Sequence, residues 1–342
     1  MRRHIFHLLL IAALAACGVV SADVVNLRSG GSVSGKIIRI EKDKLVLRTD
    51  SETKTFSREQ VKTFTFTRPG PDGTPRTVTA MFKPKPITMP FEVETAHYQV
   101  KTDISERVGK NAGRAMEQLY KAYSKIFNAE DIPQGRKAEV LIFDTKGAFL
   151  KYAQSINTQP RADTLGFFRS ASDGSSSIVT FRRQTDEFNT LSTLYHEGTH
   201  QFITLVLGRA NRPPLWVNEG LAVYFENSTW RKGKLRTGII PRKRLLHLQH
   251  SLRQGKMVHL ADLIQRGRPT FDGLCYAESW SLVYFFVHAN RGAYAGRFKK
   301  YFRALKTGTG HDEAFRACLT KDINKLERLW KKYVMGLKAP PK

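Results

Sequence analysis

The sequence predicts an α+β protein with a small β unit first, then a mixed sheet with helices, and finally a mostly helical half. Three observations support this prediction. Short alternating apolar runs fill residues 23–66, as in paired strands. From residue 98, apolar strand-like runs are interleaved with long segments of helical periodicity. From residue 241 to 337 the helical pattern is almost continuous. The 342 residues, 41% of them hydrophobic, suffice for one large and one small domain.

The first 22 residues are predicted to be a signal peptide. Arg2 and Arg3 make a basic start, and the apolar run over residues 5–16 is too short to span a bilayer as a mature helix. No later segment is long and apolar enough to cross a membrane. We therefore expect an exported protein, located in the periplasm, in the cell envelope or outside the cell, with no transmembrane segment in its mature chain.

Two processing sites compete within this segment. Residues 20–22, Val-Ser-Ala, suit ordinary signal peptidase and would leave Asp23 as the first mature residue. Residues 14–17, Leu-Ala-Ala-Cys, resemble a bacterial lipobox, which would anchor the chain through a lipid on Cys17. Because strand-like sequence begins at Val24 and leaves no flexible tether after Cys17, the first site is favoured.

Residues 23–66 are predicted to be a small β domain. The expected strands are 24–27, 33–40, 44–48, 53–56 and 61–66, with a Ser-Gly-Gly turn at 29–31. This meander resembles a short Sm-like or SH3-like barrel. Such barrels bind partners or act as packing modules, and the packing role is favoured here.

Residues 67–92 are predicted to be an extended linker because proline is concentrated there. Beyond it lies a large domain over residues 93–337. Its expected strands are 98–101, 138–143, 165–169 and 177–182, and its first expected helices are 105–127, 146–155, 186–207 and 215–227. The prolines of the linker are Pro69, Pro71, Pro75, Pro84, Pro86 and Pro90.

The net charge of +26 indicates attraction to anionic surfaces. Removal of residues 1–22 takes away two arginines and lowers the charge from +26 to +24. The basic residues are spread along the chain, which favours solubility and contact with envelope polymers or lipid head groups. No helix-turn-helix, zinc-finger or aromatic RNA-binding motif accompanies them, so no specific nucleic-acid partner is expected. An RNA-binding role for the Sm-like segment also conflicts with the signal peptide.

The cysteine content leaves one question open. After processing at residue 22, only Cys275 and Cys318 remain. In an oxidising compartment they would either pair or stay as two separate buried thiols, and the sequence favours neither outcome.

The segment His196-Glu197-Gly198-Thr199-His200 indicates a metal site. On a helix, residues i and i+4 lie on one face, so both imidazoles can reach one Zn²⁺. Glu197 lies beside the first histidine, where a carboxylate can take a proton from water activated by the metal. The alternative is an exposed helix with two ordinary histidines. Apolar residues at helical spacing on both sides favour a half-buried helix instead.

Glu219 supplies the third expected ligand. It follows His200 after eighteen intervening residues, within the segment 216–226, which is expected to be a second helix. Gly208 and the Pro213-Pro214 pair mark a tight connection between the two helices. A catalytic zinc ion typically has three protein ligands and one open position, and a carboxylate from this second helix completes that set.

The combination of His-Glu-x-x-His, eighteen residues, and Glu within Trp-x-x-Glu-Gly-x-Ala-x-Tyr resembles the gluzincin metallopeptidases. It is especially similar to the aminopeptidase-N-like branch and to bacterial peptidase-MA-like proteins. The motifs cover residues 195–226, and the flanking pattern is compatible from 98 to 334. The resemblance implies one Zn²⁺ per chain, held by His196, His200 and Glu219, with Glu197 as general base. It also implies an edge strand before the first motif helix, here 177–182, that aligns the substrate backbone.

Two departures from that family narrow the expected activity. The chain is much shorter than the aminopeptidases, and it lacks the upstream Gly-x-Met-Glu-Asn segment that holds a substrate's free amine. The resemblance therefore implies an endopeptidase acting on peptides or proteins. The alternative is an inactive zinc-binding envelope scaffold, against which the retained Glu197 argues.

The family also implies a tyrosine or histidine, downstream of the third ligand, that donates to the oxyanion. Tyr276 at the start of an expected helix over 276–289 is the first candidate, and His288 is the second. A core or capping role for Tyr276 remains equally open. Glu226, seven residues after Glu219, is expected either to support the metal ligands or to pair with an arginine.

Overall fold

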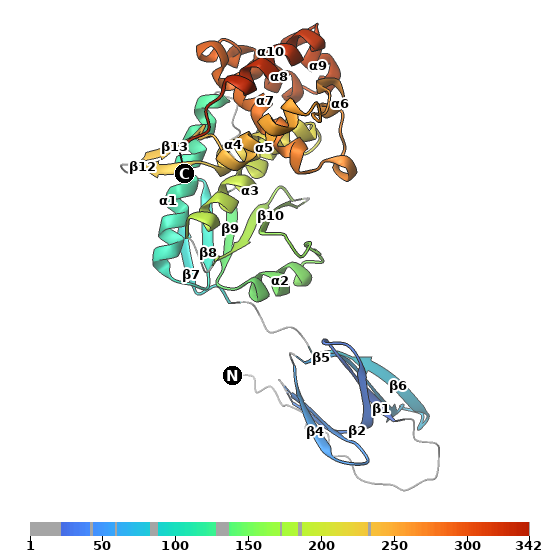
Figure 1. Ribbon diagram of the computed structural model, residues 1–342. Helices are drawn as coiled ribbons and strands as arrows, with labels where there is room; N and C mark the ends of the chain where they lie inside the picture. The colour runs from blue at the N-terminus through green and yellow to red at the C-terminus, as the bar shows by residue number, and fades with distance from the viewer. Residues whose placement is uncertain are drawn as a thin grey trace. The chain divides into compact units, whose positions relative to one another are not determined.

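The computed structural model describes residues 22–341, except residues 42–43, 59, 83–87, 128–136, 172, 184–186 and 232–233. The predicted signal peptide, including Cys17, lies outside the described residues apart from Ala22. The chain divides into two compact units, Met1–Pro86 and Ile87–Lys342. The architecture is α+β, as predicted, and Figure 1 shows the elements of each unit.

The first unit is a six-stranded antiparallel sheet with the strand order β4-β3-β2-β1-β5-β6. Its core consists of apolar side chains that alternate along the strands, among them Val25, Leu45, Leu47 and Phe64. The described strands form an open sheet, since β4 and β6 end it without pairing to each other, so the predicted barrel is not closed. The strands are β1 (Asp23–Leu27), β2 (Ser32–Ile40), β3 (Lys44–Arg48), β4 (Thr53–Ser57), β5 (Val61–Pro69) and β6 (Pro75–Ala80).

Part of the proline-rich segment is a hairpin, in contrast to the predicted linker over 67–92. Strand β5 continues to Pro69, and β6 pairs with it through a turn in which Gly73 has a φ of 76°. The paired prolines, Pro69 and Pro75, lie at the turn end of the ladder, and β6 is an edge strand. Proline lacks an N–H but is tolerated at such positions, so its abundance here did not exclude a strand.

The second unit begins with a five-stranded mixed sheet in the order β10-β11-β9-β8-β7. Strands β8 and β11 run parallel to β9, whereas β7 and β10 are antiparallel edges. Alternate residues of β9 enter different cores: Val140 and Ile142 face one layer, and Leu141 and Phe143 face the other. The strands are β7 (Phe91–Glu94), β8 (Tyr98–Thr102), β9 (Ala138–Phe143), β10 (Gly166–Ser170) and β11 (Ser176–Phe181).

Three helices cover this sheet. Helix α1 (Glu106–Ile126) begins at Ser105, whose side chain accepts a hydrogen bond from the Val108 amide. It packs with α3 (Glu187–Leu207) in the main core, and α2 (Lys146–Ser155) packs in the smaller core through Phe149. Helix α3 contacts α1 and the strands β10 and β11 of the sheet.

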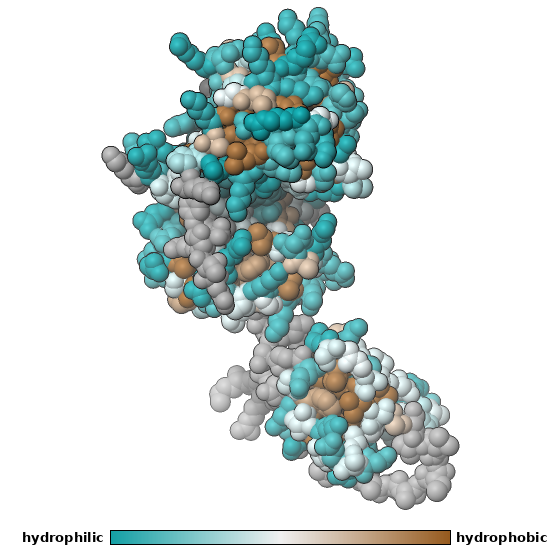
Figure 2. All heavy atoms as spheres, in the orientation of Figure 1, coloured by the Kyte–Doolittle hydropathy of each residue, from teal (hydrophilic) through white to brown (hydrophobic). Residues whose placement is uncertain are grey.

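The rest of the second unit is helical, apart from the short hairpin β12 (Thr229–Arg231) and β13 (Lys234–Arg236). Three buried tryptophans, Trp216, Trp280 and Trp330, lie in its core. Hydrophilic residues cover most of the helical half on the face seen in Figure 2. The helices are α4 (Leu215–Glu226), α5 (Arg242–Arg253), α6 (Leu260–Leu263), η2 (Arg268–Thr270), α7 (Gly273–Gly292), α8 (Ala295–Lys306), α9 (His311–Cys318) and α10 (Ile323–Gly336).

No helix in the described part of the chain is long and apolar enough to cross a membrane. The two cysteines are free rather than paired: Cys275 is buried near the start of α7, and Cys318 is partly buried at the end of α9.

Two glycines allow close helix packing beside the sequence motifs. A Cβ at Gly220 would lie 2.5 Å from the Ser279 carbonyl oxygen, so α4 and α7 cross almost backbone to backbone. A Cβ at Gly198 would lie 2.7 Å from Met116 Cε, the flexible end of a side chain on α1. The α4–α7 contact therefore has less freedom to adjust than the α1–α3 contact.

Gly220→Ala is predicted to destabilise the protein by about 1–3 kcal/mol, because backbone atoms cannot move away as a side chain can. Gly198→Ala serves as the matched control, since Met116 can change rotamer and alanine has the higher helix propensity. Chemical denaturation of both variants measures the difference. Equal losses in the two variants would contradict the backbone explanation.

Glu278 makes stability depend on pH. It is fully buried on α7, and Oε1 accepts a hydrogen bond of 2.9 Å from the Val258 amide. Burial raises the pKa of Glu278 from 4.5 to about 7. Between these values the unfolded chain ionises while the folded chain keeps its proton, so stability falls as pH rises through that window.

Glu278→Gln should remove this effect and keep the bond to Val258. The variant is predicted to gain on the order of 3 kcal/mol over wild type above pH 7, with the gain shrinking as pH falls towards 4.5. Urea denaturation at a series of pH values tests this. A stability difference that does not change with pH would refute it.

Candidate metal centre

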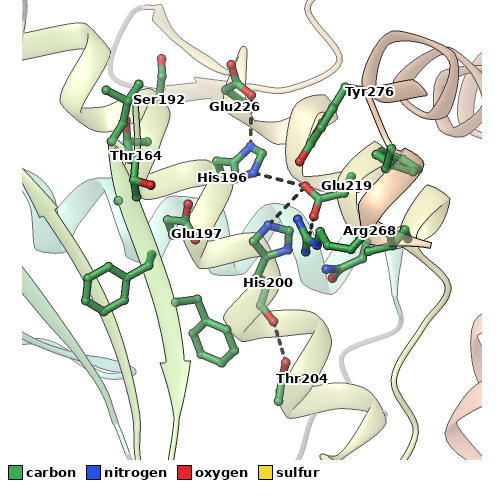
Figure 3. A pocket seen from close by; sticks show the side chains of 18 of the residues that line it. Thr164, Ser192, His196, Glu197, His200, Thr204, Glu219, Glu226, Arg268 and Tyr276 are labelled. Carbon is green, nitrogen blue, oxygen red and sulfur yellow. Dashed lines mark hydrogen bonds and ion pairs between the residues drawn. The ribbon is translucent and has the colours of Figure 1, made fainter. Parts of the chain in front are cut away.

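Helices α3 and α4 bring the three predicted ligands together. His196 and His200 lie one turn apart on α3, and Glu219 lies on α4. Gly208, with a φ of 76°, ends α3, and Pro214 precedes the first residue of α4. One ligand atom from each of the three residues lies within 4.8 Å of the others. In Figure 3 both imidazoles point towards the Glu219 carboxylate.

The spacing of these atoms suits a metal ion. Glu219 Oε2 lies 3.6 Å from His196 Nε2 and 3.7 Å from His200 Nε2. These distances exceed those of good hydrogen bonds. Tetrahedral ligands with metal bonds of about 2.0–2.2 Å stand roughly 3.3–3.5 Å apart, close to the observed spacing. Two imidazole nitrogens and a carboxylate oxygen also form a donor set typical of divalent first-row metals.

The pKa values of all three side chains are shifted from their ordinary values. Burial alone would lower the pKa of His196, but the Glu219 and Glu226 carboxylates outweigh it and raise this pKa to about 10. Burial and the positive charge of His196 lower the pKa of His200. Burial opposes ionisation of Glu219, yet the two histidines and Arg268 lower its pKa to about 2. The raised pKa of His196 means that a metal ion would compete with a proton for this imidazole.

Outer contacts hold the ligands in place. His196 Nδ1 lies 3.1 Å from Glu226 Oε2, and Arg244 of α5 lies 3.6 Å from the other oxygen of that carboxylate. Glu226 therefore fills both of the roles that the sequence analysis offered as alternatives. It orients the predicted ligand His196, and it pairs with Arg244. Arg268, in η2, contacts Glu219 Oε1 at 2.9 Å. No local sequence pattern marks Arg244 or Arg268, since each reaches the site only through the packing of distant elements.

The structure places the two candidate oxyanion donors differently. Tyr276 lines the same cleft as the ligands, and its hydroxyl points towards Glu219 in Figure 3. Burial and the charge of Glu219 raise the pKa of Tyr276, so the phenol stays protonated at neutral pH. His288 does not line this cleft, and its Nε2 lies 3.0 Å from the Tyr224 hydroxyl.

The ligands face a cleft of about 1660 Å³. Glu197 on α3 and the edge strand β10 form part of its wall. The edge strand differs from the expected one: the segment 177–182 forms β11 in the sheet interior, and β10 is the edge. A Cβ at Gly166 of β10 would lie 2.7 Å from Thr193 Cγ2 and 3.4 Å from Glu197 Cγ, so glycine lets this strand run close to α3.

His200→Ala and Glu219→Ala are each predicted to lose stoichiometric metal, since two ligands hold a divalent ion poorly. Glu226→Gln should keep the metal but bind it about 10–100-fold more weakly, because His196 loses its orienting carboxylate. Metal analysis after dialysis against graded chelator measures both effects. His288→Ala is the control and should bind metal as wild type does. Unchanged metal content in Glu219→Ala would exclude this centre.

Part of the chain is similar to a known protein family. A family model described as "Protein of unknown function (DUF1570)" matches residues 190–305. The match begins on α3 and ends on α8, so it contains His196, His200, Glu219 and Tyr276. It leaves out the N-terminal unit and the strands of the mixed sheet. No curated protein matches the chain. The region similar to this family therefore contains the three residues that could hold a metal ion.

Proposed function

We propose that the protein is a zinc-dependent peptidase, and an endopeptidase rather than an aminopeptidase. The observation that carries the proposal is the position of Glu197. In Figure 3 it lies on α3 beside the two imidazoles, and it lines the same cleft as the three predicted ligands. A structural metal site has no need of an additional carboxylate beside its ligands.

Each side chain then has a chemical role. A bound zinc ion would supply Lewis acidity and lower the pKa of water to about 7. Glu197 would accept the proton of the attacking water and return it to the leaving amine. Tyr276 would donate a hydrogen bond to the carbonyl oxygen as it gains negative charge, which its raised pKa allows. Glu226 would hold the ring of His196 in its ligating orientation.

Strand β10 supports a peptide as the substrate. Its outer edge pairs with no other described strand and lies along the wall of the cleft beside Glu197. An extended peptide can add to such an edge through main-chain hydrogen bonds, which position a scissile bond independently of side chains. In this proposal β10 takes the role that the resemblance to gluzincins had assigned to residues 177–182.

The carboxyl groups of the cleft favour an endopeptidase. An aminopeptidase needs a free anionic group for the substrate's amino terminus. Apart from Glu197, the described carboxylates that line the cleft already have partners: Glu219, Glu226, Asp163 and Asp272. Together with the predicted signal peptide, these features lead us to propose an exported enzyme acting on peptides or proteins outside the cytoplasm.

Glu197→Gln is predicted to lower the rate of peptide cleavage by about 10²–10⁴-fold without loss of zinc, because the proton acceptor is removed and the ligands stay. Tyr276→Phe should lose about 10²–10³-fold in kcat with little change in KM, as expected for a donor used only in the transition state. Cleavage of an unbiased peptide library, with metal content measured in parallel, tests both variants.

Two outcomes would refute the proposal. Stoichiometric zinc in wild type and Glu197→Gln, with no cleavage by either, would favour a zinc-binding scaffold in the cell envelope. A wild-type rate retained by Glu197→Gln would show that another group accepts the proton.

A further inference from the structure

Six arginines and five carboxylates line the cleft, and they differ in whether they have partners within the protein. The arginines are Arg161, Arg183, Arg209, Arg212, Arg244 and Arg268. Four of them contact other described groups. Arg268 and Arg244 neutralise Glu219 and Glu226, Arg161 faces Asp163, and Arg209 donates to the Ala171 carbonyl. The side chains of Arg183 and Arg212 make no hydrogen bond or ion pair with a described residue.

The two arginines without such partners lie towards opposite ends of β10. The Arg183 amide donates a hydrogen bond to Thr190 Oγ1 on α3. One turn later on α3, Thr193 lies next to Gly166, the first residue of β10. Arg212 lies in the connection between α3 and α4, three residues after Arg209. The Arg209 side chain donates a hydrogen bond to the carbonyl oxygen of Ala171, the residue that follows β10. The five residues of this strand span about 16 Å. Both arginines line the cleft together with β10.

The described part of the cleft offers little free negative charge to a basic substrate side chain. Its described carboxylates other than Glu197 are already engaged, so a lysine or arginine of a substrate would find no free anionic partner there. A divalent metal ion adds further positive charge. Aspartate and glutamate side chains, in contrast, suit guanidinium groups in geometry as well as in charge.

We propose that the substrate is an acidic peptide segment, with carboxylate side chains flanking the scissile bond and contacting Arg183 on one side and Arg212 on the other. This inference rests on the proposed peptidase function and names its substrate class. Charge complementarity in the cleft selects such segments, and the pairing of β10 with the peptide backbone sets their register.

A binding experiment tests the inference separately from catalysis. The full chain with Glu197→Gln, loaded with zinc, is titrated into three fluorescent ten-residue peptides with the same apolar centre. Their flanks carry aspartate and glutamate, asparagine and glutamine, or lysine, and fluorescence anisotropy reports the affinity. The acidic peptide should bind at least about tenfold more tightly than the neutral one, and the preference should weaken as salt is raised. Equal binding of the three peptides would overturn the proposal.

Substitutions that reverse the charge of the two arginines test whether they cause the preference for the acidic peptide. Added to Glu197→Gln, the pair Arg183→Glu and Arg212→Glu should abolish the acidic preference, and the milder pair Arg183→Gln and Arg212→Gln should reduce it at least tenfold. The matched control, Arg328→Glu with Lys332→Glu, makes the same charge change on α10 outside the cleft and should keep the preference. Circular dichroism checks that each variant folds. Equal weakening in the control would show that only the net charge matters, and would overturn the assignment.

Cleavage of the peptide library separates the two proposals. Wild-type cleavage without enrichment of acidic residues near the cut site would contradict the substrate class and leave the peptidase function standing. Selective binding of acidic peptides without any cleavage would contradict the peptidase function and leave the acidic specificity of the cleft standing.

Discussion

The structure of the candidate metal centre depends on one buried charge, the carboxylate of Glu219. A carboxylate removed from water is strongly destabilising unless cations or hydrogen-bond donors surround it. Here His196, His200 and Arg268 surround it, and they come from α3 and from the segment before α7. The negative charge that could hold a metal ion therefore also contacts cationic groups from these separate elements.

This arrangement explains why α4 is buried almost all round. Nine of its residues are buried, and its apolar side chains are not confined to one face. Helix α3 packs on one side of it and α7 on the other, with Gly220 allowing the close α7 contact. Because α7 also carries Tyr276, the distance between Glu219 and the phenol is set by backbone packing rather than by a flexible loop. Such rigidity is what preorganised catalytic groups require.

The charges of the site are arranged in layers around the ligands. Carboxylates lie close to the metal position, and arginines such as Arg244 and Arg268 contact those carboxylates from outside. This order lets the inner site hold a divalent cation while the rest of the cleft presents positive charge to whatever enters. The large net charge of the chain has the same sign, which agrees with the acidic substrate that we propose.

The sequence alone determined those features that depend on local periodicity. The His-Glu-x-x-His segment places two imidazoles on one helical face wherever that helix lies, and the apolar run over residues 138–143 predicts a strand. Most helix and strand positions, and the α+β class, followed from the same periodicities. Glu219 could also be predicted as a ligand from the sequence, because a short connection between two helices restricts where the second helix can pack.

The tertiary structure decided everything that depends on contacts between distant segments. It showed that β10 rather than β11 is the edge strand, that the N-terminal sheet stays open, and that prolines 69 and 75 end a hairpin. It also brought Arg244 and Arg268 onto Glu226 and Glu219, while His288 packed against Tyr224. Strand order, sheet closure and ion pairing across elements are set by the packing of whole layers. The periodicity within a single segment does not predict that packing.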